Sequence, residues 1–194
     1  MRTAEKLRKT TETDIKLFLN LDGEGKYDIK TKIGFFDHML ELFAKHSQMD
    51  LDLSCDGDVH VDEHHSVEDS GIALGSAIAE ALGDKAGITR YATQFVPMDE
   101  TLVMVNLDIS GRPFFYYDVE FQSKGAGEFD AQWCEEFFRA LAVNAGFTLH
   151  ISMIYGENTH HIIEAIFKAT GRAIREAVSI DPRQKGIPST KGVL

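Results

Sequence analysis

The chain has 194 residues, 43% of them hydrophobic and 26% charged, as expected of a globular protein with its own core. Its formal net charge of −11 at pH 7 argues against nonspecific nucleic-acid binding, because such binding needs basic surface to displace counterions. No apolar run is long enough to span a bilayer, and residues 1–14 lack the apolar stretch of a signal peptide. Cys55 and Cys134 form no CxxC motif and are predicted to be reduced thiols, either in the core or at the surface. We therefore expect a cytoplasmic protein that binds neither nucleic acid nor membrane.

The first half of the chain is predicted to begin with strands and to end with a helix. Ile15, Leu17 and Leu19 alternate with polar residues, which is typical of a half-buried strand. Gly83 follows the last helical run and is a typical helix terminator. The predicted elements are strands within 2–21 and at 27–33, a helix at 35–44, a strand at 49–55 and a helix at 67–82.

The second half repeats this order of elements. Strands are predicted at 89–96, 101–109 and 114–121, followed by a helix at 131–145, a strand at 147–154 and a helix at 160–178. A single repetition indicates a duplicated supersecondary unit rather than a solenoid, which would need more copies. We therefore predict an α+β fold of two β-β-β-α-β-α units, residues 1–88 and 89–194, that together form one compact domain.

A motif of two histidines and a glutamate occurs once in each half, before an apolar helical run. If the motif lies in the first turns of a helix, the first histidine and the glutamate stand four apart on one face, as a chelating pair. The second histidine projects about 100° away, towards a different metal or another surface. The two copies are His64, His65 and Glu68, and, 96 positions later, His160, His161 and Glu164.

The repeated motif predicts a metal function, with polar helix starts as the alternative. Imidazole and carboxylate without thiolate suit Mn, Fe, Ni, Co or Zn, and a carboxylate in each set fits octahedral Mn better than structural Zn. The preceding helices align at an offset of 98, which places His38 opposite Glu136. Two ligand sets are therefore predicted: His38, His65, His160 and Glu164 in one, and His64, Glu68, Glu136 and His161 in the other.

Five segments spread over essentially the whole chain carry a specific resemblance: Phe36–Leu40, His64–Asp69, Thr148–His150, His160–Ala165 and Pro188–Leu194. Together they resemble the imidazoleglycerol-phosphate dehydratase family of histidine biosynthesis. The resemblance implies a ribosomal protein S5 domain 2-like fold, in which each unit is a four-stranded sheet backed by two helices. It also implies a homo-oligomer of 24 subunits, with active sites between subunits and two Mn²⁺ ions per site. In some members the residue at the position of Glu136 is a metal-binding histidine, so this ligand departs from their pattern.

The reaction that the resemblance implies removes water from imidazoleglycerol phosphate to give imidazole acetol phosphate. The C–H bond to be broken lies beside no carbonyl, so the imidazole ring must act as the electron source. With a metal on each ring nitrogen, the imidazolate expels the neighbouring hydroxyl through a diazafulvene-like intermediate, and a carboxylate then removes the proton.

The resemblance also implies which carboxylates act in this reaction. Glu12 is the leading acid or base, and Glu164 assists proton transfer besides ligating a metal. Asp99 and Glu100 orient a metal-bound water or the leaving hydroxyl. Without the resemblance, Glu12 is an exposed strand carboxylate and the other two belong to a turn.

The phosphate of the substrate needs fixed cations, and arginine suits it through bidentate donation. Taken singly, each basic residue is a solvated surface charge, and His46 and His150 either line the site or fill polar positions on their elements. By resemblance, the substrate-binding residues are Glu12, His46, Arg90, Arg112, Lys168, Ser189 and Lys191.

Two other functions fit the metal motif alone. A dinuclear metallohydrolase would also use histidine and carboxylate clusters, to activate water, and would need no imidazole in its substrate. A metal storage or sensing protein would bind Mn, Ni or Zn without turnover. Neither function explains why Arg112 and the basic C-terminal motif accompany the metal clusters.

Overall fold

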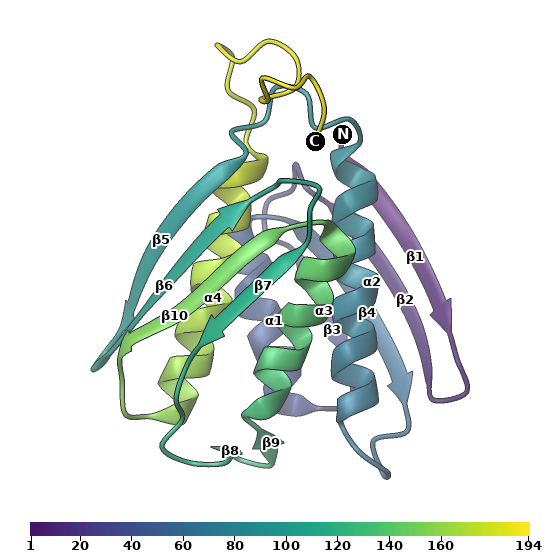
Figure 1. Ribbon diagram of the computed structural model, residues 1–194. Helices are drawn as coiled ribbons and strands as arrows, with labels where there is room; N and C mark the ends of the chain where they lie inside the picture. Colours follow the sequence, from purple (N-terminus) through teal and green to yellow (C-terminus); the bar gives the residue numbers. More distant parts are fainter.

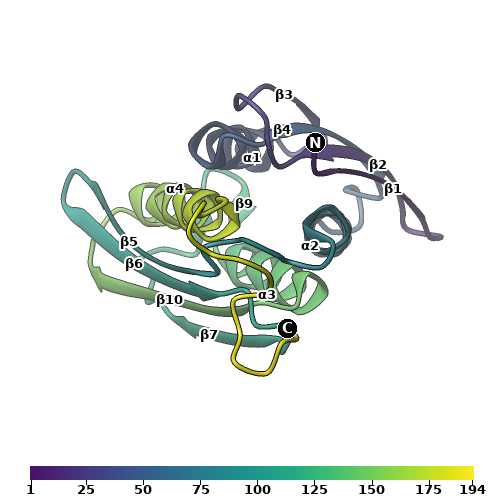
Figure 2. The ribbon, with the colours of Figure 1, turned by 90° about the horizontal axis from the view of Figure 1, so that it is seen from above.

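The computed structural model describes residues 1–194. Two four-stranded β-sheets form the outer layers of the molecule, and the helices lie between them (Figures 1 and 2). The first unit contains β1 (Thr3–Lys9), β2 (Thr13–Asn20), β3 (Tyr27–Lys30), α1 (Gly34–Ser47), β4 (Asp50–Gly57) and α2 (His64–Leu82). The second contains β5 (Tyr91–Met98), β6 (Thr101–Asp108), β7 (Phe114–Asp118), β8 (Gly125–Ala126), β9 (Phe129–Asp130), α3 (Gln132–Ala145), β10 (Thr148–Tyr155) and α4 (Thr159–Val178).

The two large sheets share one topology, which confirms the predicted duplicated α+β fold. Their strand orders are β1-β2-β4-β3 and β5-β6-β10-β7. In each sheet the first three strands of this order pair antiparallel, and the last strand joins its neighbour in parallel. The predicted boundary between residues 88 and 89 falls in the connection from α2 to β5 and stays a prediction.

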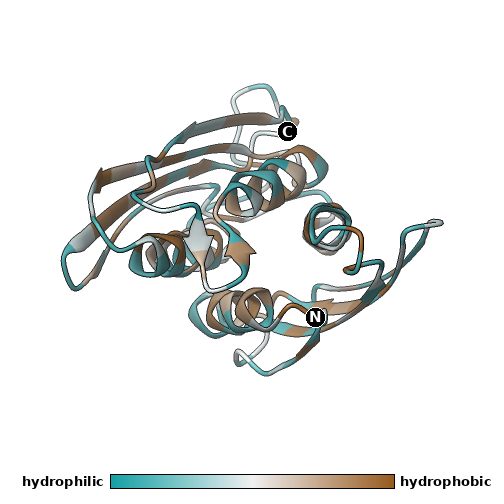
Figure 3. Cartoon of the chain, turned by 90° about the horizontal axis from the view of Figure 1, so that it is seen from below, coloured by the Kyte–Doolittle hydropathy of each residue, from teal (hydrophilic) through white to brown (hydrophobic).

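The core lies between the sheets and the helices. Ile15, Leu17 and Leu19 of β2 are buried, as their alternation with polar residues predicts. Helix α1 packs against α4, and α2 packs against α3, so each contact joins the two units. The Phe36 ring of α1 meets the Phe137 ring of α3 at 5.3 Å between centroids. Figure 3 shows hydrophobic stretches along the strands and helices, but none of the helices combines the length and apolarity needed to cross a membrane.

Both cysteines belong to this core as free thiols. Burial raises the pKa of Cys134 to about 12, and burial also raises the pKa of Cys55. The sequence did not decide whether these two thiols lie in the core or at the surface. The structure places both in the interior.

Glycines allow the paired helices to approach closely. A Cβ atom added to Gly75 of α2 would lie 2.5 Å from the Leu141 carbonyl oxygen of α3. The equivalent glycine of α4, Gly171, faces the Phe43 carbonyl of α1, and its added Cβ would lie 2.8 Å from that oxygen. These clashes are with backbone atoms, which cannot move away as a flexible side chain can.

Replacing Gly75 by alanine is expected to lower the free energy of unfolding by about 1–3 kcal/mol, because the new methyl group overpacks the contact between α2 and α3. Urea unfolding followed by circular dichroism, at one protein concentration, measures the change. Gly34→Ala is the matched control, because a Cβ at Gly34 meets nothing within 4 Å. Equal destabilisation by the two substitutions would contradict the close helix contact.

The short β8–β9 hairpin is an element that the sequence analysis missed. It lies between β7 and α3, where the first unit has no counterpart, and β7 ends at Asp118, before the end predicted at residue 121. The Phe129 ring lies 5.3 Å from that of Phe35 at the start of α1. The Ser123 hydroxyl donates to the Thr159 hydroxyl at the start of α4, at 2.8 Å. The hairpin segment is thus fastened to the starts of two helices.

Candidate active site

The motif of the first unit opens helix α2. The carboxylate of Asp62 accepts a hydrogen bond from the backbone N–H of His64 at 3.0 Å and so satisfies a free donor of the first turn. On the helix surface, Nε2 of His64 lies 3.4 Å from Oε2 of Glu68. The predicted chelating pair therefore has its two donor atoms side by side.

The second histidine of this motif, His65, lies between two carboxylates from other elements. Its Nδ1 is 3.0 Å from Oδ1 of Asp58, which follows β4. Its Nε2 is 3.8 Å from Oε1 of Glu12, in the turn between β1 and β2. The hydrogen bond to Asp58 raises the pKa of His65. The structure thus brings the predicted acid or base, Glu12, beside a predicted metal ligand.

The motif of the second unit opens helix α4 in the same way. The side chain of Asn158 caps the helix by accepting from the backbone N–H groups of His160 and His161 at 2.9 and 3.4 Å. Nε2 of His160 lies 3.2 Å from Oε2 of Glu164. The other oxygen of Glu164 is 2.5 Å from Nζ of Lys168, one turn further along the helix. Burial raises the pKa of Glu164, but Lys168 and His160 hold it below its ordinary value.

His161 is also flanked by two carboxylates. Its Nδ1 is 2.8 Å from Oε2 of Glu100, and its Nε2 is 3.9 Å from Oδ2 of Asp99. Glu100 also accepts from the backbone N–H of Asn158 at 2.9 Å, and these bonds hold the pKa of Glu100 far below its usual range. The bond to Glu100 in turn raises the pKa of His161. Asp99 and Glu100 form the turn between β5 and β6, where Asp99 has a left-handed backbone with φ of 49°.

An aromatic ring supports the first histidine of each motif. The His64 ring lies edge-on to Trp133 of α3 at 4.9 Å, and the His160 ring lies edge-on to Phe35 of α1 at 5.1 Å. The two contacts are equivalent in the duplication, since Phe35 and Trp133 stand 98 positions apart. The start of α1 therefore meets the start of α4, and the start of α3 meets the start of α2.

The remaining two predicted ligands lie one turn beyond these aromatic residues. His38 faces Glu41, with 3.9 Å between Nδ1 and Oε2, and Glu136 faces Arg139 at the same distance. Within one chain, no three or more His, Cys, Asp or Glu side chains are arranged to hold a metal ion. The structure therefore brings together pairs of predicted ligands, and it does not assemble either predicted four-residue set in one chain.

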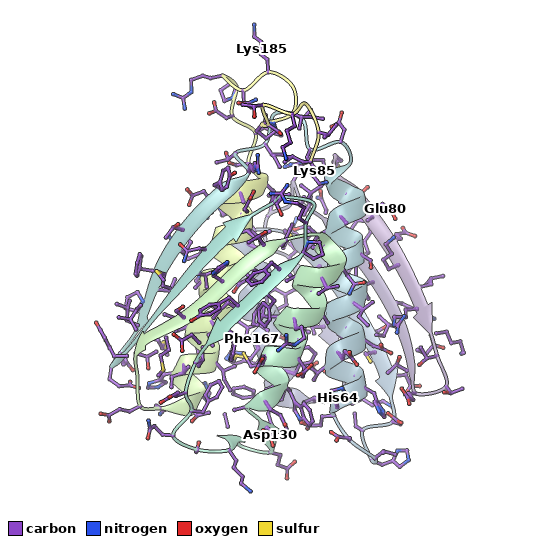
Figure 4. All side chains as sticks on the ribbon, in the orientation of Figure 1. His64, Glu80, Lys85, Asp130, Phe167 and Lys185 are labelled. Atoms are coloured by element: carbon purple, nitrogen blue, oxygen red, sulfur yellow. The ribbon has the colours of Figure 1, made fainter.

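All the predicted phosphate-binding residues except Lys168 lie at the other end of the helices. A pocket there is lined by Arg90, Arg112, Ser189 and Lys191. The backbone N–H of Arg90 donates to the carbonyl of Ala177, at the end of α4, at 2.8 Å. A helix of 20 residues is about 30 Å long, which separates this pocket from the start of α4. In Figure 4, His64 accordingly lies at the end opposite to Lys85 and Lys185.

The two arginines of the pocket differ in how many hydrogen bonds their guanidinium groups make to the rest of the chain. Nε of Arg90 donates to Asp108 at 2.7 Å, and its Nη1 donates to the carbonyl of Pro188 at 2.7 Å. The bond to Asp108 also raises the pKa of Arg90. Arg112 is exposed and donates from its guanidinium only to the carbonyl of Ser110, at 3.3 Å. Arg90 thus fixes the C-terminal segment, whereas Arg112 keeps most of its donors free.

His46 and Lys168, both predicted to bind substrate, lie between the two ends. Burial lowers the pKa of His46 of α1. The positive charges of Lys168 and Arg172 of α4 lower it further. His150 is elsewhere, on the outer face of the second sheet, where its ring lies 5.4 Å from that of Tyr116. His150 is therefore remote from the starts of α2 and α4.

Asp58 is a site residue that sequence reasoning missed. It belongs to the irregular segment before α2, where no helical or strand periodicity shows which side chains face the site. The only signal was its position seven residues before His65 in an acidic segment, and that signal is weak. The contact depends on a backbone bond, because the N–H of Asp58 donates to the carbonyl of Glu12 at 3.1 Å and joins two loops.

The donor set of the site fits divalent metals such as Mn²⁺. Each helix start offers imidazole nitrogen beside carboxylate oxygen, at 3.4 Å for His64 and Glu68 and at 3.2 Å for His160 and Glu164. Fold and site together define a class of protein: an internally duplicated α+β chain with equivalent imidazole and carboxylate clusters at the start of the last helix of each unit.

Comparison with known proteins identifies the family within this class. The family model described as imidazoleglycerol-phosphate dehydratase matches residues 31–174. The imidazoleglycerol-phosphate dehydratase of Alkaliphilus metalliredigens is 62% identical over 187 residues, 96% of each chain. That of Caldanaerobacter subterraneus subsp. tengcongensis is 59% identical over 194 residues, 100% of each chain. The chain belongs to the imidazoleglycerol-phosphate dehydratase family.

Solved structures agree with this assignment. The imidazoleglycerol-phosphate dehydratase of Staphylococcus aureus has a TM-score of 0.85 at 41% identity, covering 92% of this chain and 99% of that one. The enzyme of Pyrococcus furiosus, in complex with (S)-C348, has a TM-score of 0.84 at 39% identity, covering 97% and 100%. The resemblance stated from the sequence is therefore confirmed, and the protein is a lyase that dehydrates imidazoleglycerol phosphate in histidine biosynthesis.

Proposed function

We propose that this dehydration depends on two Mn²⁺ ions per active site and that each site forms between subunits of a cytoplasmic homo-oligomer of 24 chains. The ions would be held by the eight predicted ligands, and when bound they would supply Lewis-acid stabilisation of negative charge on the imidazole ring of the substrate. The ligands are His38, His64, His65, Glu68, Glu136, His160, His161 and Glu164.

The observation that carries the proposal is the separation, along the helices, of the histidine motifs from the basic pocket. The histidines occupy the starts of α2 and α4, whereas Arg112 and Lys191 line a pocket beyond the end of α4. A substrate that carries an imidazole and a phosphate on a three-carbon chain cannot span about 30 Å. The histidine end of one subunit must therefore meet the basic pocket of another subunit for the imidazole and the phosphate of one substrate molecule to be bound together.

Glu12 and Asp99 supply acid and base groups near the reacting carbons. Each lies on the Nε2 side of a second histidine, Glu12 at 3.8 Å from His65 and Asp99 at 3.9 Å from His161. The route we propose passes through a diazafulvene-like state of the substrate, in which C–O cleavage precedes C–H cleavage. Asp99 orients or protonates the leaving hydroxyl, Glu12 removes the carbon-bound proton, and the resulting enol ketonises.

Lys168 and Glu164 support this chemistry from one helix face. The ammonium of Lys168 lies 2.5 Å from the carboxylate of Glu164 and keeps it ionised, although burial alone would favour its neutral form. An ionised Glu164 can both ligate metal and accept a proton. Lys168 also faces His46, so both extend the polar surface from the helix start towards the middle of the molecule.

Incubating the purified enzyme with Mn²⁺ and imidazoleglycerol phosphate tests the proposal. Formation of imidazole acetol phosphate that stops with chelator and resumes when Mn²⁺ is restored is the expected result. Release of inorganic phosphate instead would favour a metallohydrolase, and metal binding without turnover would favour storage or sensing. Full activity in chelator, with metal content verified, would refute the metal dependence.

Arg112→Ala is expected to raise KM for imidazoleglycerol phosphate about 10–100-fold, as loss of a charge-assisted hydrogen bond worth about 1.5–3 kcal/mol implies. Lys191→Ala should act in the same direction, because both residues line the pocket. Steady-state kinetics with saturating Mn²⁺ measures the change. Lys185→Ala is the matched control, since Lys185 is an exposed cation of the same C-terminal segment outside the pocket lining. Equal KM values in wild type and Arg112→Ala would exclude Arg112 from phosphate binding.

A further inference from the structure

We propose that Asp58 and Glu100 are positioning residues that hold the proton of His65 and His161 on Nδ1 and so present Nε2 to a metal ion. The inference rests on the proposed metal function and assigns a shared role to two carboxylates outside the ligand sets. It stands on geometry: Nδ1 lies 3.0 Å from Asp58 in one unit and 2.8 Å from Glu100 in the other.

A neutral imidazole carries one proton, and the partner of one nitrogen decides the state of the other. A carboxylate beside Nδ1 accepts a hydrogen bond from Nδ1–H, which leaves the lone pair on Nε2 free for a metal. The bond also fixes the rotation of the ring. His65 and His161 then direct Nε2 to the side where Glu12 and Asp99 lie.

The two positioning carboxylates come from different places in their units. Glu100 stands in the turn between β5 and β6, and its counterpart 88 positions earlier is Glu12, which lies on the Nε2 side of His65 instead. In the first unit the Nδ1 contact is made by Asp58, from the segment between β4 and α2. Duplication alone would have placed the same contact at the same position. The recurrence of one contact from two positions indicates that both histidines require it.

Each carboxylate is itself held in place. Glu100 accepts hydrogen bonds from the backbone N–H of Asn158 and from the hydroxyl of Thr101, both at 2.9 Å. The backbone of Asp58 is tied to Glu12 by an N–H to carbonyl bond of 3.1 Å. The orientation of each histidine ring is therefore coupled to the loop that carries the acid or base of its unit.

Mn²⁺ titration of metal-free enzyme by calorimetry tests the role of Asp58. Asp58→Ala is expected to bind Mn²⁺ about 10–100-fold more weakly at one of the two sites, the usual loss when the partner of a ligating histidine is removed. Asp58→Asn keeps an acceptor without the charge and should lose less. The control is Asp56→Ala. Asp56 lies two residues before Asp58 in the chain, and its carboxylate pairs only with Lys32. Matching circular dichroism and melting temperatures establish that each variant is folded.

Glu100 is tested in parallel with Glu100→Ala and Glu100→Gln. The expected loss falls at the other metal site, and Glu157→Gln, on an exposed side chain of the neighbouring loop, should bind as wild type. Wild-type affinity in folded Asp58→Ala and Glu100→Ala, with binding still lost in His65→Ala, would overturn the inference and leave the proposed function standing. If Asp58→Ala does not fold, wild-type affinity in folded Glu100→Ala overturns the inference by itself. Absence of Mn²⁺ binding by the wild type would overturn both proposals.

Discussion

Metal-free enzyme carrying His64→Ala or His65→Ala is expected to take up about half the Mn²⁺ of the wild type, because adjacent helical residues point about 100° apart and serve different ions. Dehydration should fall about a thousandfold or more in both variants, since removing either ion removes charge stabilisation from one side of the imidazole ring. Elemental analysis after gel filtration gives the stoichiometry, and steady-state assays give the rate. The double variant should lose both ions.

His60→Ala is the matched control for these variants. His60 is an exposed histidine in the turn just before α2, and it has no ion-pair or hydrogen-bond partner among the site residues. It should bind both ions and turn over normally. Full Mn²⁺ content in both His64→Ala and His65→Ala would refute the division of ligands between two ions. Loss of both ions in each single variant would show that the two ions bind only together, which also contradicts independent sets.

The repeated motif made the chemistry of the helix starts predictable from sequence. His64 with Glu68 and His160 with Glu164 share a spacing of four, which fixes their donor atoms on one helix face in any helix. The register of the duplication was also readable, because the apolar positions of equivalent helices and strands repeat at nearly constant offsets. The element order and the duplication followed from these local regularities, whereas the family assignment followed from the resemblance of five short segments.

Contacts that depend on loops were not predictable in the same way. Asp58 reaches His65 only because its backbone is bonded to the turn that holds Glu12, and no periodic pattern encodes that bond. The β8–β9 hairpin has two-residue strands, too short for an alternation signal, and it is stabilised by Phe129 packing against another unit. The placement of Arg112 far from the histidines likewise depends on the direction of α4 in the fold.

The histidines and the basic pocket lie at opposite ends of α4, so a subunit-complementation experiment tests whether one active site takes them from two different subunits. His161→Ala disables the start of α4, and Arg112→Glu disables the pocket beyond the end of that helix. Each variant alone should be nearly inactive. Co-expressed in equal amounts with two different tags and purified through both, they should recover about a quarter of wild-type activity, because random assembly of a symmetric oligomer pairs the two intact ends in that fraction of sites.

His160→Ala co-expressed with His161→Ala provides the matched control, because these histidines are neighbours in one motif. Any site that receives this motif receives it from a single chain, so no combination of the two variants restores an intact pair. Recovery should therefore be absent in the control and present in the mixture of His161→Ala with Arg112→Glu. Inactivity of that mixture, with both tags found in one assembly, would mean that imidazole and phosphate ends act within one chain. The length of α4 makes that arrangement incompatible with a small substrate.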